Sequence, residues 1–150
     1  MIRRELTTEQ VEKEPWTEWN SYVDLLAMED YDDLTRIQQI ASSLFWYDSE
    51  VQNGGHLQYF LNQGLENVKA TLDALETLEN KDYHEILKKA LSKYQSLDLT
   101  GIEDVEDYIE EALEDHFGEL DEKYHSIEPT IQSILEEYLE KNRDEFILIK

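Results

Sequence analysis

The sequence predicts an all-α fold, arranged as a single compact domain of about seven helices. Apolar residues recur three or four positions apart through most of the chain, which is the spacing of one face of a helix. The two prolines, Pro15 and Pro129, stand where helices are expected to begin. The 150 residues contain no Pro/Gly/Ser-rich linker and no internal repeat. We therefore expect an N-terminal arm at residues 1–15 and one helical domain at residues 16–150.

The first two helices are expected after Pro15 and Asp33. The apolar series over 16–26 begins directly after Pro15, and the series over 34–45 begins directly after Asp33. Both series are amphipathic, so we expect their apolar residues, starting with Trp16, to form the stripes that face the core.

A third, short helix is expected after Gly55, with Leu57, Phe60 and Leu61 available to the core and Gly64 as its stop. The same spacing of apolar residues then predicts four later helices. Their expected ranges are 65–78, 83–94, 105–117 and 127–139. Only the final residues, FILIK, resemble a strand.

The charge of the chain restricts its partners. Thirty-six acidic against 13 basic residues leave a formal net charge of -23. Such a surface repels nucleic acid and anionic lipid and attracts basic proteins, and a groove for nucleic acid would need positive charge. No stretch approaches the roughly 18 to 20 apolar residues that span a bilayer, and the absence of cysteine fits a reducing compartment. We expect a cytoplasmic protein with a basic partner, without direct nucleic-acid binding or membrane contact; its oligomeric state stays open.

The acids are densest in residues 103–122, which hold eleven acids and no base. Residues three or four apart on a helix lie about 5 to 6 Å from each other, so a helix here would carry a carboxylate stripe. Such a row resembles the phosphates of DNA in charge and in spacing, although the alternative is an ordinary solvated face. Most of these acids lie in the helix predicted over 105–117. We call the eight acids of residues 103–115 the acidic run and expect them to bind the partner. They are Glu103, Asp104, Glu106, Asp107, Glu110, Glu111, Glu114 and Asp115.

Catalytic and metal-binding patterns find little support in the sequence. It lacks the nucleophile elbow, the zinc-protease motif and the phosphate-binding loop. Glu122 and His125 supply one Glu-x-x-His spacing, where a di-metal helical bundle needs two. His56, His84 and His116, like His125, are expected at surface or capping positions. The sequence thus predicts no enzyme, catalytic residue, metal site or cofactor.

The stretch EVQNGGHLQYFLNQG, residues 50–64, contains three of the five glycines. One interpretation is a tight corner between two helices, because Asn and Gly adopt the left-handed conformation that closes a helix. The other is a polar pocket of His56, Gln58, Asn62 and free backbone amides at a helix N-terminus, which suits an anion.

The segment SEVQNGGHLQYFLNQG resembles the Asn-Gly-Gly, then Gln-aromatic-aromatic-x-Asn signature of a bacterial family of unknown function that includes a DNA-mimic protein. LDEKYHSIEPTIQSILEEYLEKNRDEF is similar to the family's C-terminal pattern. Together with the Trp-rich first helix, the likeness covers roughly residues 16–147. The resemblance implies an all-α, DNA-mimic-like domain and, for the mimic-type member, an acidic surface that engages a DNA-binding transcription regulator. The signature residues are Asn53, Gly54, Gly55, Gln58, Tyr59, Phe60 and Asn62.

Three functional hypotheses follow. The first is a non-enzymatic DNA mimic that occupies the basic surface of a transcription regulator or another DNA-binding protein through the acidic run. The acids Glu29, Asp30, Asp32 and Asp33 are candidates to extend that surface. The second is an immunity-type inhibitor of a basic nuclease toxin, which uses the same electrostatics. The third is a small-ligand module centred on residues 53–62.

Overall fold

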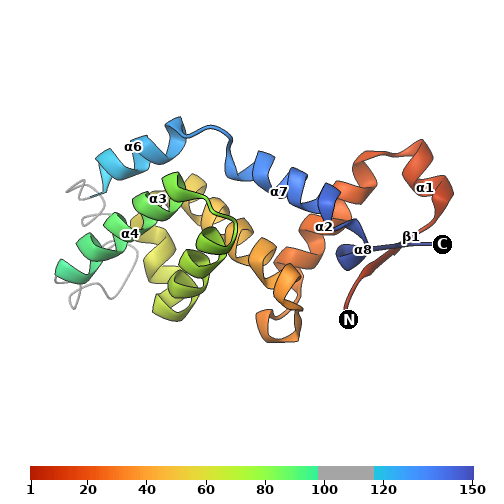
Figure 1. Cartoon of the computed structure of the whole chain (residues 1–150), viewed down its shortest axis with the longest axis horizontal. Helices are drawn as coiled ribbons and strands as arrows, with labels where there is room; N and C mark the ends of the chain where they lie inside the picture. Colours follow the sequence, from red (N-terminus) through yellow and green to blue (C-terminus); the bar gives the residue numbers. More distant parts are fainter. Residues whose placement is uncertain (98–116) are drawn as a thin grey trace. The chain divides into compact units, whose positions relative to one another are not determined.

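The structure is a computed structural model that describes residues 1–97 and 117–150 (Figure 1). Helices make up nearly all of its regular structure, so the predicted all-α class is confirmed. The described residues form seven α-helices, one 3-10 helix and two strands of three residues. In chain order these are β1 (Arg4–Leu6), α1 (Thr8–Lys13), α2 (Trp16–Met28), η1 (Tyr31–Asp33), α3 (Arg36–Thr77), α4 (Lys81–Ser96), α6 (Gly118–Ser126), α7 (Ile131–Lys141), α8 (Arg143–Phe146) and β2 (Ile147–Ile149). The helix predicted over 105–117 lies, apart from Phe117, outside the described residues.

Internal contacts divide the chain into two compact units. The terminal unit combines Met1–Asp48 with Pro129–Lys150, and the central unit is Ser49–Glu128. Helix α3 begins in the terminal unit and continues into the central unit. The signature residues, α4 and α6 all belong to the central unit.

Helix α3 is interrupted by its glycines. Gly54, Gly55 and Gly64 have non-helical backbone angles, with φ values of -156°, 76° and 78°. The interruptions leave helical stretches at 36–53, 56–63 and 65–77. These stretches correspond to the second, third and fourth helices predicted from the sequence.

The terminal unit contains a parallel two-stranded sheet. Arg4 of β1 lies opposite Ile147 of β2, and Leu6 lies opposite Ile149. Strand β2 confirms the prediction made from FILIK, whereas β1 and α1 in residues 1–15 were not predicted. Local chemistry explains α1, because Thr7 and Gln10 form a reciprocal capping box at its start.

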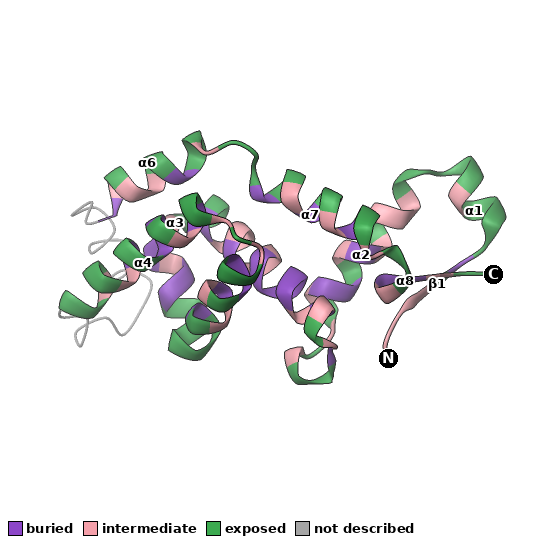
Figure 2. Ribbon diagram, viewed as in Figure 1, coloured by how far each residue is buried: buried purple, intermediate pink, exposed green. Residues whose placement is uncertain are grey.

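Buried residues of α2, of the first stretch of α3, of α7 and of α8 form the core of the terminal unit. Tyr22 of α2 meets the ring of Phe146 edge-on, with the centroids 4.7 Å apart. Helix α7 turns a single buried face inward, as the colouring in Figure 2 shows. Its buried residues Ile131, Leu135 and Leu139 recur every four positions.

A buried amide joins the two chain segments of the terminal unit. The side chain of Gln38 donates to the carbonyl of Ile2 at 2.6 Å and to that of Glu145 at 2.7 Å. Gln38 is fully buried, so these bonds satisfy a polar group that burial would otherwise penalise.

The core of the central unit is aromatic and aliphatic. Tyr59 and Phe60 of α3 are buried, as is Tyr83 of α4, which packs against Tyr124 of α6 with the ring centroids 5.2 Å apart. The aliphatic core residues of this unit are Val51, Leu57, Val68, Leu75, Ile86 and Leu87.

Some residues predicted to face the core are exposed. Trp16 is 60% exposed because it is the first residue of α2, ahead of the packed part of the helix. Leu61 is 36% exposed, since it lies beside the buried face that is centred on His56 and Phe60. Leu65 is 43% exposed and directly follows Gly64, whose positive φ breaks the helical periodicity.

Candidate functional site

The acidic run lies outside the residues that the structure describes. None of Glu103, Asp104, Glu106, Asp107, Glu110, Glu111, Glu114 or Asp115 is described. The described part of the candidate site consists of the elements on either side of the run and of the signature residues. Helix α4 ends at Ser96 before the run, and Phe117 with α6 follows it.

One signature residue contacts both sides of the run. The ring of Phe60 lies 4.7 Å from that of Tyr94 in α4 and 5.9 Å from that of Phe117, centroid to centroid. Phe60 is only 2% exposed and Phe117 only 4%. Two described residues on either side of the run, Tyr94 before it and Phe117 after it, thus pack on the same buried ring.

A second connection joins the signature stretch to α6. Asp121 of α6 accepts a hydrogen bond from the backbone N–H of His56 at 3.0 Å, and the same oxygen lies 2.6 Å from His56 Nδ1. The imidazole is completely buried and stacks edge-on with Tyr124. His56 is therefore not at the surface, although its backbone N–H does stand at the start of a helical stretch. The carboxylate of Asp121 satisfies that amide as a capping side chain would.

The two adjacent glycines provide room for these contacts. A Cβ at Gly55 would lie 2.4 Å from Oδ2 of Asp121, and one at Gly54 would lie 2.1 Å from Oε1 of Gln58. Gly55 also has a φ of 76°, which side chains disfavour. At Gly55, both the backbone conformation and the close approach of α6 favour glycine.

The polar side chains of the signature bond within the chain. Gln58 and Asn62 both donate to Oε2 of Glu50, at 3.2 Å and 2.7 Å. The buried hydroxyl of Tyr59 donates to that of Thr71 at 2.8 Å. Asn53 is exposed at the end of the first helical stretch of α3.

These contacts limit what the stretch can do chemically. The backbone amide of His56, which an anion at this helix start would need, already donates to a carboxylate. Burial raises the pKa of Tyr59 well above its ordinary value, so its hydroxyl is a weaker acid than that of an exposed tyrosine. Within residues 1–97 and 117–150, no three His, Asp or Glu side chains are grouped as metal ligands, and no helix is apolar over a length that would cross a membrane.

The other proposed acids belong to the terminal unit. Asp30, Asp32 and Asp33 are exposed around η1. Glu29 instead forms an ion pair with Arg4 at 2.9 Å. Its charge is offset within the chain, which leaves the three aspartates as the accessible acids of this group.

Asp121 is the residue that sequence reasoning missed. It was counted among the acids of residues 103–122, with no sign that it binds a residue 65 positions earlier. The chain offers no local signal for this pair, because His56 and Asp121 meet only when α3 and α6 pack together.

The comparisons with known proteins give one result. No curated protein and no solved structure matches the chain. A family model described as DMP19-like protein matches residues 32–142. That range contains the signature residues, the acidic run and Asp121, and it covers well over half of the 150 residues. The chain belongs to the family of DMP19-like proteins.

Proposed function

We propose that this protein is a non-enzymatic DNA mimic. In this proposal the acidic run binds the basic DNA-binding surface of a DNA-binding protein, such as a transcription regulator, and so excludes DNA. The observation that carries the proposal is the dense set of carboxylates inside the region matched by the DMP19-like family. Membership of the family and the net charge of -23 both support it.

Electrostatics supply the driving force. A DNA-binding surface is rich in Lys and Arg placed to neutralise a row of phosphates, and binding releases counterions. Residues 103–115 offer eight acids and no base to the same surface. The affinity should therefore fall steeply as salt is added, as it does for DNA itself.

The described contacts support a positioning role for the signature. Phe60 packs on Tyr94 and Phe117, which lie on the two sides of the acidic run. Asp121 then fixes α6 to His56. Fixing both ends of a binding segment lowers the entropy lost on association, which is the benefit of preorganisation.

The same contacts argue against a ligand site at residues 53–62. The amide of His56 and the side-chain amides of Gln58 and Asn62 donate to carboxylates of this chain. We therefore place the proposed function in the acidic run.

A comparison of two variants with equal charge tests the proposal. In the run variant, Glu103, Glu110 and Glu114 become Gln and Asp107 becomes Asn. In the control variant, the exposed residues Glu12, Glu66, Glu136 and Glu140 become Gln. A pull-down from the native cell first identifies a partner, and fluorescence anisotropy then follows release of that partner's labelled DNA duplex.

The unmodified chain and the control variant should release the duplex, and the run variant should need at least about tenfold more protein, because several charge pairs are lost. Simultaneous binding of the chain and the duplex would refute mimicry, as would equal competition by the run variant. A captured nuclease whose cleavage is inhibited by the chain would instead support the immunity-type function.

A further inference from the structure

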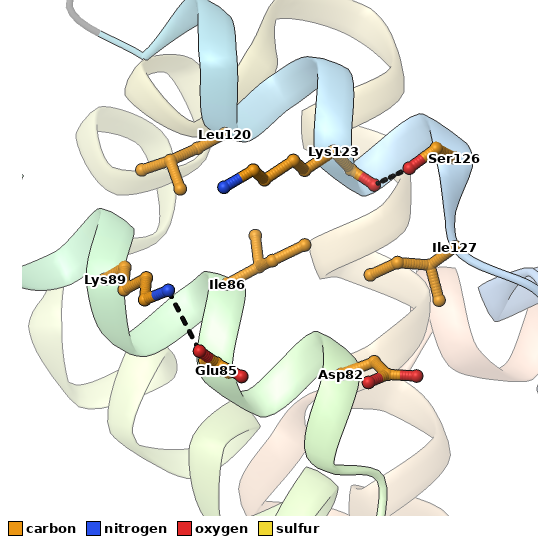
Figure 3. A pocket seen from close by; sticks show the side chains of 8 residues that line it. All are labelled: Asp82, Glu85, Ile86, Lys89, Leu120, Lys123, Ser126 and Ile127. Atoms are coloured by element: carbon orange, nitrogen blue, oxygen red, sulfur yellow. Dashed lines mark hydrogen bonds and ion pairs between the residues drawn. The ribbon is translucent and has the colours of Figure 1, made fainter.

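A hollow lies in the central unit between α4 and α6, with a volume of about 260 Å³ (Figure 3). Ile86 of α4, Leu120 of α6 and Ile127 line it with aliphatic side chains. Lys89 of α4 and Lys123 of α6 line it with ammonium groups. Two of the thirteen basic residues of a very acidic chain thus share one small hollow.

Helical spacing brings these groups together. Ile86 and Lys89 are three residues apart on α4, and Leu120 and Lys123 are three residues apart on α6, so each pair lies on one face of its helix. Figure 3 shows both lysine side chains at the Leu120 end of the hollow, whereas Ile127 lies at the opposite end with Asp82. The hollow therefore has two ammonium groups at one end and aliphatic side chains in the middle. Each ammonium is paired with a glutamate of its own helix, Lys89 with Glu85 at 2.9 Å and Lys123 with Glu119 at 3.6 Å.

The pKa of one carboxylate in the hollow is lowered by both lysines. Glu85 forms an ion pair with Lys89, whose Nζ lies 2.9 Å from Oε1 of Glu85. That hydrogen bond lowers the pKa of Glu85 below its usual value, and the charge of Lys123 acts in the same direction. Both ammonium groups therefore stabilise a negative charge at this place. Their present partners, Glu85 and Glu119, are exposed side chains that a bound carboxylate would have to displace.

We propose that this hollow binds a small aliphatic carboxylate. The carboxylate would lie between Lys89 and Lys123, and the alkyl chain would cover Ile86, Leu120 and Ile127. The carboxylate matches the two ammonium groups in charge, and the chain removes aliphatic surface from water. This site is separate from the acidic run and does not depend on the function proposed above.

The volume sets the size of the ligand. Pockets for drug-sized ligands and cofactors occupy about 300 to 1,000 Å³, so a hollow of about 260 Å³ suits a compact molecule rather than a nucleotide. A bound ligand would contact α4, which precedes residues 98–116, and α6, which follows them.

Octanoate is a suitable probe, with octanol and acetate as comparisons. Octanol carries the chain without the charge, and acetate carries the charge without the chain. Calorimetric titration of the full chain at an ionic strength of about 0.15 M suppresses repulsion from acids beyond about 8 Å. We expect octanoate to bind more tightly than either comparison molecule.

A matched pair of double variants locates the site. Lys89→Gln with Lys123→Gln should weaken octanoate binding at least about tenfold, the effect of losing a charge-assisted hydrogen bond. The control is Lys13→Gln with Lys141→Gln. Like Lys89 and Lys123, these two lysines each pair with a glutamate four residues earlier, but they lie outside the hollow. The control should leave the affinity unchanged. Glu85→Gln removes the competing carboxylate and should strengthen binding.

Circular dichroism of each variant checks that it is folded. Equal weakening by both double variants would overturn the proposal, since the effect would then follow net charge and not the hollow. Absence of octanoate binding to the unmodified chain would also overturn it, as would octanol binding as tightly as octanoate.

Discussion

A single carboxylate oxygen of Asp121 contacts both the backbone nitrogen and the ring nitrogen Nδ1 of His56, at 3.0 Å and 2.6 Å. His56 is fully buried, and removal of Asp121 would take this acceptor away from both groups. The contact fixes α6 against the glycine pair that precedes His56.

Asp121→Ala should therefore destabilise the protein by about 1 to 3 kcal/mol, the usual cost of removing a charged acceptor from buried polar groups. Asp121→Asn keeps an acceptor oxygen and should cost less. Urea denaturation followed by circular dichroism measures both changes. The neighbouring exposed Glu122→Ala serves as the control and should lie within about 0.5 kcal/mol of the unmodified chain.

Two glycines of α3 allow backbone strain to be separated from side-chain crowding. Gly55 and Gly64 have similar φ and ψ angles, in a region that is nearly restricted to glycine. A Cβ at Gly55 would meet Asp121, whereas no described atom lies within 4 Å of one at Gly64. Gly64→Ala should cost about 1 to 3 kcal/mol from strain, and Gly55→Ala should cost more in the same urea experiment. Equal costs would show that the approach of Asp121 does not matter.

The buried tyrosines predict opposite effects of removing a hydroxyl. Among the described residues, the hydroxyl of Tyr22 has no hydrogen-bond partner although the residue is fully buried. Tyr22→Phe should thus leave stability unchanged or raise it by up to about 1 to 3 kcal/mol. Tyr59→Phe removes the bond to Thr71 and should lower stability by about 0.5 to 1.5 kcal/mol. Thermal unfolding of the two variants compares them directly.

Stability should decline at alkaline pH. Burial raises the pKa of Tyr138 to about 12 and raises that of Tyr22 further. Above about pH 10 the unfolded chain loses tyrosine protons that the folded chain retains, so the free energy of unfolding falls as pH rises. Urea midpoints between pH 9 and 12 should show this slope, and Tyr22→Phe should reduce it. A slope unaffected by Tyr22→Phe would assign the effect to other groups.

Phe60→Leu tests the link between the signature and the proposed partner site. The change removes the ring that Tyr94 and Phe117 share and should weaken competition with DNA while the helical signal is retained. Phe45→Leu, at a half-buried phenylalanine of the terminal unit, should leave competition unchanged. If Phe60→Leu competes as well as the unmodified chain, the positioning role is wrong, whereas mimicry by the acidic run is not.

Helical periodicity was sufficient to predict the fold class and most helices. It identified α2, α4 and the three stretches of α3, because each has a regular apolar stripe. It missed the short helices α6 and α8, and the helix predicted over 127–139 begins only at Ile131, after the N-cap Thr130. It also failed for β1, whose three residues pair with a strand more than 140 positions away. A strand that short carries too few residues to show an alternating pattern.

The candidate site was less predictable because its contacts are distant in sequence. The glycine pair identified the corner of α3, but nothing near Gly55 indicates that Asp121 fills the space above it. The burial of His56 likewise follows from the packing of Tyr124 and Asp121, both in α6. Such pairs arise only from tertiary structure.

The parallel pairing of β1 with β2 also restricts the order in which the parts of the chain can fold. The central unit is one uninterrupted stretch, whereas the terminal unit needs residues from both ends of the chain. During synthesis all of residues 49–128 are produced before β2 exists, so the central unit can fold first. Residues 4–6 must wait for residues 147–149, and until then the N-terminal segment presents unpaired backbone groups to chaperones and proteases.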